Sequence, residues 1–143
     1  MRRNLCPALG IRVGSKVSVI NPPAGFVTAL NPLPDGVEFL ITAQTGLDVI
    51  LFFTERRREL VERLPALSRA MALRGGIWIC WPEGRVDTQL SEDFIREAAL
   101  AIGMVDDKRA TFDETWSALR LVWKPRSRLD KPEGRTKASA AQA

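Results

Sequence analysis

The chain has 143 residues, of which 45% are hydrophobic and 27% are charged, and these proportions are typical of one globular domain. The sequence contains no histidine, which excludes His-based catalytic triads, imidazole acid–base catalysis and histidine metal ligands. The formal net charge of +4 comes from the C-terminal stretch, because the residues before Lys124 carry equal numbers of acidic and basic side chains.

The two cysteines form no CxxC motif, so we expect no metal site. Cys80 lies in the apolar run IWICW and is predicted to be a core residue, whereas Cys6 is predicted to be an exposed thiol near a mobile start. The chain has no run of about 20 apolar residues. It also begins without the apolar core of a secretion signal. We therefore expect a cytoplasmic protein that does not bind membranes.

The first third of the chain alternates short apolar runs with turn residues. Residues 16–20 (KVSVI) are typical of a buried strand. Pro23 favours the start of a short helix over residues 24–30. The next two strands are predicted at residues 37–42 and 47–53, and the second of these is apolar almost throughout, as in a strand covered on both faces.

A longer helix is predicted at Glu55–Met71, with Thr54 as its N-cap. The arginines at positions 56–58 alternate with glutamates, and we interpret them as a solvated helix face in preference to a phosphate clamp. Pro65 is expected to kink this helix, and Gly75–Gly76 to end the helical stretch.

The last third of the chain is predicted to add a strand, a helix and a hairpin. The strand covers Ile77–Trp81 and leads into a polar loop. Ser91 is expected to cap the following helix, which Gly103 ends. Residues 105–112 and 118–124 are too close in sequence for a crossover helix, so we expect them to form an antiparallel pair or to straddle a neighbouring strand.

This alternation predicts an α/β fold with right-handed crossovers. The sheet is expected to be mostly parallel and six-stranded, in the order 2-1-3-4-6-5 along the chain numbering, with strand six antiparallel and helices on both faces. Residues 1–14 are expected to lead into a single domain at residues 15–125. Residues 126–143 form a basic tail with almost nothing apolar to bury, so we expect it to be disordered and to contact nucleic acid only non-specifically.

Two resemblances follow from these segments. Similarity to class I methyltransferases is carried by LDVILFF, the helix that leads to MALRGGIWICW, and the closing GMVDDKRATFDETWSALRLVWKP. It implies a Rossmann-like, methyltransferase-like three-layer sandwich. A second resemblance, to the bacterial domain-of-unknown-function family 3052, is carried by GSKVSVINPPAGF, GGIWICWP and LSEDFIREAAL. Members of that family carry two lysines after Trp–Pro, whereas this chain has Glu83–Gly84 there and Arg85 as its first basic residue. The family implies no established activity.

The turn after the first strand lacks the features of a cofactor loop. A dinucleotide or S-adenosylmethionine site needs a glycine-rich turn there, so that the backbone approaches the ligand. This chain has Asn-Pro-Pro-Ala-Gly at positions 21–25, and its two prolines have no backbone N–H. The carboxylate expected after the second strand is also missing, since Thr42, Ala43 and Gln44 stand in its place. We therefore predict no cofactor.

A ligand site, if the chain has one, is expected at the carboxyl ends of the parallel strands. The side chains expected to converge there are Asn21, Thr54, Trp81, Arg85 and Ser91. Helix N-termini at this edge favour an anion, and Arg85 would pair with its phosphate or carboxylate. These features favour a non-enzymatic binding or regulatory domain whose partner is a small anionic ligand or another protein. The alternative is a divergent S-adenosylmethionine- or nucleotide-binding enzyme, and the sequence leaves open whether the chain is an enzyme.

Overall fold

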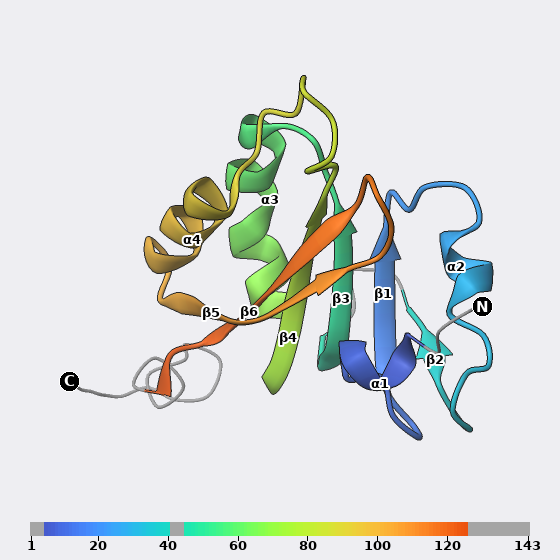
Figure 1. The fold of residues 1–143 in the computed structure, drawn as a ribbon. Helices are drawn as coiled ribbons and strands as arrows, with labels where there is room; N and C mark the ends of the chain where they lie inside the picture. The colour runs from blue at the N-terminus through green and yellow to red at the C-terminus, as the bar shows by residue number, and fades with distance from the viewer. Residues whose placement is uncertain (1–4, 41–44, 126–143) are drawn as a thin grey trace, which may run out of the picture.

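The computed structural model describes residues 5–40 and 45–125. Figure 1 shows a central sheet with helices on both of its faces. In chain order the elements are α1 (Cys6–Leu9), β1 (Lys16–Ile20), α2 (Phe26–Ala29), β2 (Glu38–Phe39), β3 (Leu47–Phe53), α3 (Arg57–Ala70), β4 (Met71–Trp81), α4 (Glu92–Leu100), β5 (Met104–Thr111) and β6 (Ser117–Trp123).

The six strands form one sheet in the order β2-β1-β3-β4-β6-β5, which confirms the predicted order. The strands β2, β1, β3 and β4 pair in parallel. Strand β6 runs antiparallel to both of its neighbours, β4 and β5. The sheet is therefore mostly parallel and closes on an antiparallel ribbon, as the sequence predicted.

Alternate residues of the central strands supply two hydrophobic cores, one on each face of the sheet. Ile50 and Phe52 of β3 belong to the core beneath α3 and α4. Leu51 and Phe53 belong to the core beneath α1 and α2. This alternation is the period-2 geometry of a strand that is covered on both faces. It gives the three layers that Figure 1 shows.

Strand β4 begins six residues earlier than the sequence predicted. It runs from Met71 through the pair Gly75–Gly76, so the expectation that these glycines end the helical stretch is wrong. Leu47 pairs with Met71, whereas Val49 pairs with Gly76, so extra β4 residues bulge out between the two pairs. A β-carbon on Gly75 would lie 2.8 Å from the Leu47 carbonyl oxygen, which explains why the bulge needs glycine.

The start of the chain packs on the sheet. Cys6 is only 1% exposed, so the prediction of an exposed thiol is wrong, and burial raises the pKa of this thiol. The Trp78 indole Nε1 donates a hydrogen bond of 3.0 Å to the Leu9 carbonyl oxygen, which ties α1 to β4. A four-residue helix with Pro7 in its first turn has too short a pattern to be recognised in the sequence.

Two further expectations need correction. The helix α3 begins at Arg57 with Arg56 as its N-cap, so Thr54 is not the capping residue. Strand β2 covers only Glu38–Phe39, which is shorter than the expected strand at residues 37–42. Residues 41–44, where the missing carboxylate was expected, and residues 126–143, the basic tail, lie outside the described residues. Within residues 5–40 and 45–125, no helix is long and apolar enough to cross a membrane.

Candidate functional site

The order of the strands places a switch point between β1 and β3. The chain leaves β1 towards β2 on one side of the sheet and leaves β3 towards β4 on the other. In open α/β sheets, ligands bind outside the carboxyl ends of the strands at such a point. Here those ends lead into Asn21 and Thr54, two of the residues that the sequence predicted for the site.

The carboxylate of Glu59, in the first turn of α3, joins Asn21 and Thr54. The Thr54 hydroxyl donates a hydrogen bond of 2.6 Å to Glu59 Oε1. The Asn21 side-chain Nδ2 donates a bond of 3.4 Å to Glu59 Oε2. Asn21 has a φ of 57°, a left-handed conformation that asparagine tolerates better than most residues. One acidic side chain therefore contacts both strand ends that flank the switch point.

A cavity of about 610 Å³ opens beside these three residues, between the strand ends and the first turns of α3. Its wall includes three glutamates and three arginines, so it has no excess of positive charge for an anion. The charged residues that line it are Glu55, Arg56, Arg58, Glu59, Glu62 and Arg63.

Two backbone N–H groups at the start of α3 already have acceptors. The Arg56 N–H donates to Thr54 Oγ1 at 3.4 Å, and the Arg57 N–H donates to Gln89 Oε1 at 3.3 Å. The Arg58 side chain is paired with Glu62 at 3.2 Å, as expected of a solvated helix face. These contacts reduce the number of donors that α3 offers to a bound anion.

Aromatic side chains pack on the other side of the switch point. The ring centroids of Phe26 and Phe53 lie 4.7 Å apart, and those of Phe53 and Trp116 lie 5.3 Å apart. Phe112 lies 5.1 Å from Phe26. Trp116 is half-buried in this group, which also lines a cavity of about 390 Å³ next to the turn after β1. The group brings together residues from three separate segments of the chain, namely α2, β3 and the turn between β5 and β6.

The other three predicted residues do not line the cavity beside Asn21 and Thr54. Trp81 is 1% exposed and belongs to the core beneath α3 and α4. Arg85 pairs with Glu55 and, at 3.8 Å, with Asp87. The Ser91 hydroxyl accepts a hydrogen bond of 3.1 Å from the Phe94 N–H, so it caps α4 as predicted. Whether any of the five residues binds a ligand stays a prediction.

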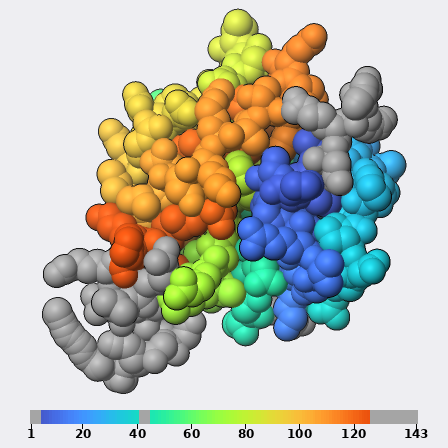
Figure 2. All heavy atoms as spheres, turned by 60° about the horizontal axis from the view of Figure 1, so that its bottom comes forward, coloured from blue at the N-terminus to red at the C-terminus, as the bar shows by residue number. Residues whose placement is uncertain are grey.

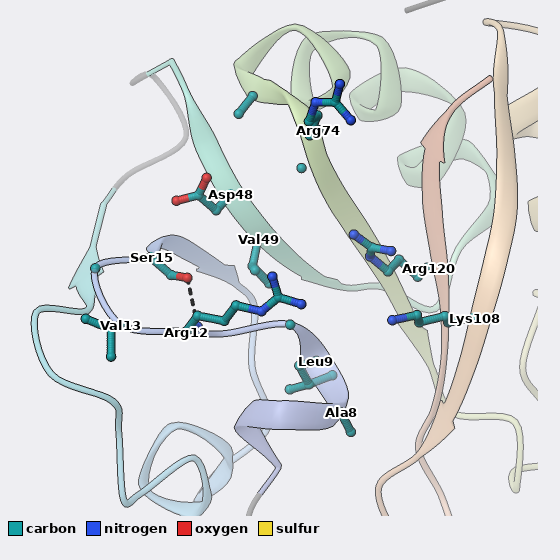
Figure 3. A pocket seen from close by; sticks show the side chains of 14 residues that line it. Ala8, Leu9, Arg12, Val13, Ser15, Asp48, Val49, Arg74, Lys108 and Arg120 are labelled. Carbon is teal, nitrogen blue, oxygen red and sulfur yellow. Dashed lines mark hydrogen bonds between the residues drawn. The ribbon is translucent and has the colours of Figure 1, made fainter. Parts of the chain in front are cut away.

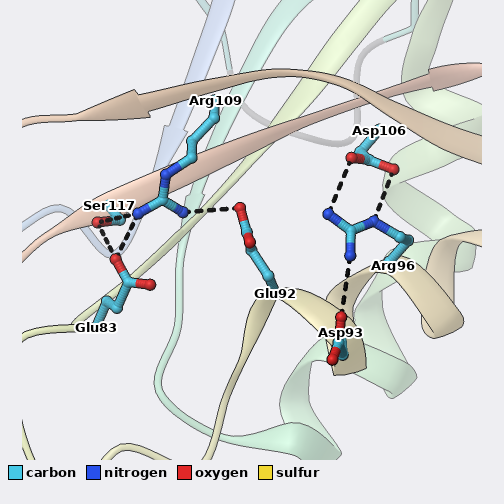
Figure 4. A network of polar contacts seen from close by, with 7 residues as sticks. All are labelled: Glu83, Glu92, Asp93, Arg96, Asp106, Arg109 and Ser117. Carbon is cyan, nitrogen blue, oxygen red and sulfur yellow. Dashed lines mark hydrogen bonds and ion pairs between the residues drawn. The ribbon is translucent and has the colours of Figure 1, made fainter.

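The structure also reveals a polar network at the carboxyl end of β4 that the sequence analysis missed (Figure 4). The Arg109 guanidinium contacts Glu83 Oε1 at 2.6 Å and Glu92 Oε2 at 2.9 Å. The Ser117 hydroxyl donates a 2.8 Å bond to the same Glu83 oxygen. Arg109 also lies over the ring of Trp81, with its Cζ 5.6 Å from the ring centroid. The four polar residues are far apart in the sequence, so they form no local motif from which the network could be predicted.

The charge of Glu83 contributes to the stability of this network. The hydrogen bond from Ser117 and the bonded guanidinium of Arg109 hold the pKa of Glu83 below its ordinary value of 4.5. A lowered folded-state pKa adds stability above the unfolded pKa, and this stability is lost as the pH falls through the folded pKa. We expect Glu83→Gln to lower the free energy of unfolding at pH 7 by about 1 kcal/mol or less, because Glu83 is nearly half exposed.

Urea denaturation between pH 7 and pH 3 measures this effect. The difference between wild type and Glu83→Gln should shrink as the pH falls below about 4.5, the ordinary carboxyl pKa, since the wild-type carboxylate is then protonated. Glu97→Gln is the matched control, because Glu97 is exposed on α4 and has no side-chain partner among the described residues. A Glu83→Gln effect that is independent of pH would contradict the role assigned to its charge.

Comparison with known proteins gives one family and a group of similar folds. A family model described as "Protein of unknown function (DUF3052)" matches residues 35–125. A search of the curated proteins gives no significant match. Among solved structures, a TehB-like SAM-dependent methyltransferase from Corynebacterium glutamicum is 13% identical with a TM-score of 0.53, and the match covers 78% of this chain and 82% of that one.

Two further solved structures have similar folds. Magnesium protoporphyrin IX methyltransferase from Synechocystis is 10% identical with a TM-score of 0.56, and the match covers 84% of this chain and 74% of that one. The fibrillarin pre-rRNA processing protein from Methanococcus jannaschii is 10% identical with a TM-score of 0.55, over 79% of this chain and 68% of that one. At these identities the similarity establishes the fold alone, and it confirms the predicted methyltransferase-like architecture.

Proposed function

The chain belongs to the DUF3052 family of proteins of unknown function, and we propose that it is a cytoplasmic, non-enzymatic binding or regulatory domain. In this proposal a methyltransferase-like fold is retained and its cofactor site has degenerated. The observation that carries the proposal is the carboxylate of Glu59, which contacts Asn21 and Thr54 across the switch point. A cofactor at that point would have to displace these hydrogen bonds.

The turn after β1 supports the same proposal. Cofactor loops of this fold class present backbone N–H groups to the ligand, and Pro22 and Pro23 have none to present. The Phe26 N–H, at the start of α2, donates to the Pro23 carbonyl oxygen at 3.1 Å. The turn therefore has few backbone donors left for a phosphate or a carboxylate.

The carboxylates of Glu55, Glu59 and Glu83 at this edge are engaged in ion pairs or hydrogen bonds. A general acid or base works best with a pKa near the operating pH. The contacts of Ser117 and Arg109 move the pKa of Glu83 in the opposite direction, so this carboxyl stays ionised at neutral pH. Glu55 is paired with Arg85. With no histidine in the sequence, these contacts favour a binding function over catalysis.

A divergent S-adenosylmethionine- or nucleotide-binding enzyme is the second candidate. The cavity of about 610 Å³ beside the switch point favours it, because small-molecule sites usually have volumes of about 300–1,000 Å³. Its position at the carboxyl ends of β1 and β3 is also where this fold class binds ligands.

Isothermal titration calorimetry of the full chain distinguishes the two candidates. The ligands are S-adenosylmethionine, S-adenosylhomocysteine, ATP and NAD. We expect no saturable binding at about 1 mM ligand, which corresponds to a binding free energy weaker than about −4 kcal/mol.

Micromolar binding that Asn21→Ala or Thr54→Ala abolishes would overturn the proposal and establish the second candidate. Thr28→Ala is the control, because Thr28 is exposed on α2 and lines none of the cavities described at the switch point.

A further inference from the structure

Another cavity, of about 310 Å³, lies at the opposite edge of the sheet, near the amino ends of β3 and β4 and beside the C-terminal end of α1. Figure 2 brings the bottom of Figure 1 forward and shows the α1 segment, the start of β4 and the β5–β6 ribbon around this region. Four basic side chains line the cavity, and Asp48 is the single carboxylate in the lining that the structure describes. The basic residues are Arg12, Arg74, Lys108 and Arg120. We call this space the amino-end cavity.

Three of these four cations form no ion pair in the part of the chain that the structure describes. Among residues 5–40 and 45–125, no ion pair or side-chain hydrogen bond involves the side chain of Arg12, Arg74 or Lys108. The Asp48 carboxylate accepts a 2.8 Å hydrogen bond from the Lys16 N–H, at the start of β1. By contrast, Arg85 and Arg109 at the carboxyl edge are paired with carboxylates. The amino-end cavity therefore has an uncompensated positive charge.

The fourth cation, Arg120, has a fixed position in the wall. Its side chain lies against the backbone of β4, because a β-carbon on Gly76 would come within 2.5 Å of Arg120 Nε. Asp107 holds one guanidinium nitrogen at 2.8 Å, and the side chain is only 20% exposed. Figure 3 shows Arg12 and Arg120 pointing towards one another across the cavity. The glycine pair in β4 therefore opens the space and lets an arginine lie along its wall.

We propose that the amino-end cavity binds the phosphate group of a small phosphorylated ligand. Guanidinium groups bind phosphate through two parallel hydrogen bonds, and here two of them face one space with a lysine beside them. The volume lies at the lower end of the range for small-molecule sites, which favours a small ligand. The proposal goes beyond the function proposed above, because it concerns the opposite edge of the sheet and different residues.

Calorimetric titration of the full chain with pyrophosphate tests this site. We expect saturable one-to-one binding, and we expect Arg12→Gln and Arg74→Gln each to weaken it about tenfold or more, because each removes a charged hydrogen bond. Arg57→Gln is the matched control, since Arg57 is exposed at the N-terminal end of α3, at the carboxyl edge of the sheet, and makes the same change of charge. This control is expected to change the affinity less than about twofold, because a distant exposed charge is screened by salt.

Thermal denaturation gives a second readout. Pyrophosphate should raise the melting temperature of the wild type and have much less effect on Arg12→Gln and Arg74→Gln. Without the anion, neither substitution should lower the melting temperature, because each relieves repulsion between like charges. A fall of several degrees in both variants would mean that these side chains hold the fold together, and it would overturn the proposal.

Two further outcomes contradict the proposed ligand. Absence of saturable pyrophosphate binding at about 1 mM would exclude the site. Equal loss of affinity in Arg57→Gln would show diffuse charge attraction instead of a cavity. The phosphate groups of nucleic acid are the competing source of the same chemistry, so a DNA gel shift is run in parallel at low and moderate salt. DNA binding that Arg12→Gln and Arg74→Gln weaken, without pyrophosphate binding, would refute the small-ligand proposal.

Discussion

Replacing Trp78 with alanine is expected to lower the free energy of unfolding by about 3–5 kcal/mol, the usual cost of truncating a buried aromatic side chain. Trp78 is 1% exposed and packs in the core beneath α1 and α2. The substitution also leaves the Leu9 carbonyl oxygen without its indole donor. For a domain of this size the melting temperature should fall by about 10–20 °C.

The variant Trp78→Phe separates packing from hydrogen bonding. It keeps most of the apolar surface and removes the Nε1–H donor, so we expect a loss of about 1–2 kcal/mol. Urea denaturation measures the free energy of unfolding of both variants. Thiol labelling of the native state measures the exposure of Cys6, which lies in α1 and is buried in the wild type. Rapid labelling of Cys6 should accompany the loss of stability. A Trp78→Ala variant with wild-type stability would contradict the assignment of α1 to the core.

The substitution Gly84→Ala is expected to lower the free energy of unfolding by about 1–3 kcal/mol, because overpacking a closely fitted contact usually has this effect. An alanine β-carbon would overlap the Glu114 carbonyl oxygen and come within 3.1 Å of the Thr115 Cα, and both neighbours are backbone atoms. The turn between β5 and β6 would therefore have to move away from the loop after β4. That movement stretches the 3.0 Å hydrogen bond from the Gly84 N–H to the Thr115 carbonyl oxygen.

Thermal denaturation of Gly84→Ala beside Val86→Ala tests this contact. Val86 belongs to the same loop and is fully exposed, so its truncation should change the free energy of unfolding by less than about 0.5 kcal/mol. Equal stability of the two variants would show that the loop and the turn separate without cost, and would contradict the close packing at Gly84.

The strand order could be predicted from the sequence because each crossover connection allows few positions for the next strand in the sheet. Strands that alternate with helices form a parallel sheet, and residues 105–112 and 118–124 were too close for a crossover. The start of β4 could not be predicted, because a glycine pair usually indicates the end of a helix. In the structure, Gly75–Gly76 lie inside the strand and allow a bulge. The helix α1 was missed because four residues around Pro7 carry no periodicity.

The candidate sites were predicted less completely than the fold. Asn21 and Thr54 follow the carboxyl ends of β1 and β3, a position that follows from the topology, whereas their role in a ligand site stays a prediction. Their common partner Glu59 was read as part of a solvated helix face, and side-chain contacts of this kind need three-dimensional structure. The basic residues of the amino-end cavity come from four distant segments, so the sequence shows no cluster. The three-dimensional structure brings them together around one cavity, where Arg120 packs on Gly76.

Amide chemical-shift mapping of the full chain during addition of S-adenosylmethionine tests most directly whether the cofactor site has degenerated. The resonances that distinguish a degenerated site from a retained one are the backbone amides of Asn21, Thr54 and Glu59, which lie at the switch point. If the cofactor site has degenerated, these resonances do not shift at about 1 mM ligand, a concentration that detects even weak binding. Saturable shifts centred on these three amides would contradict this degeneration, because they would show that the crevice still accepts the cofactor.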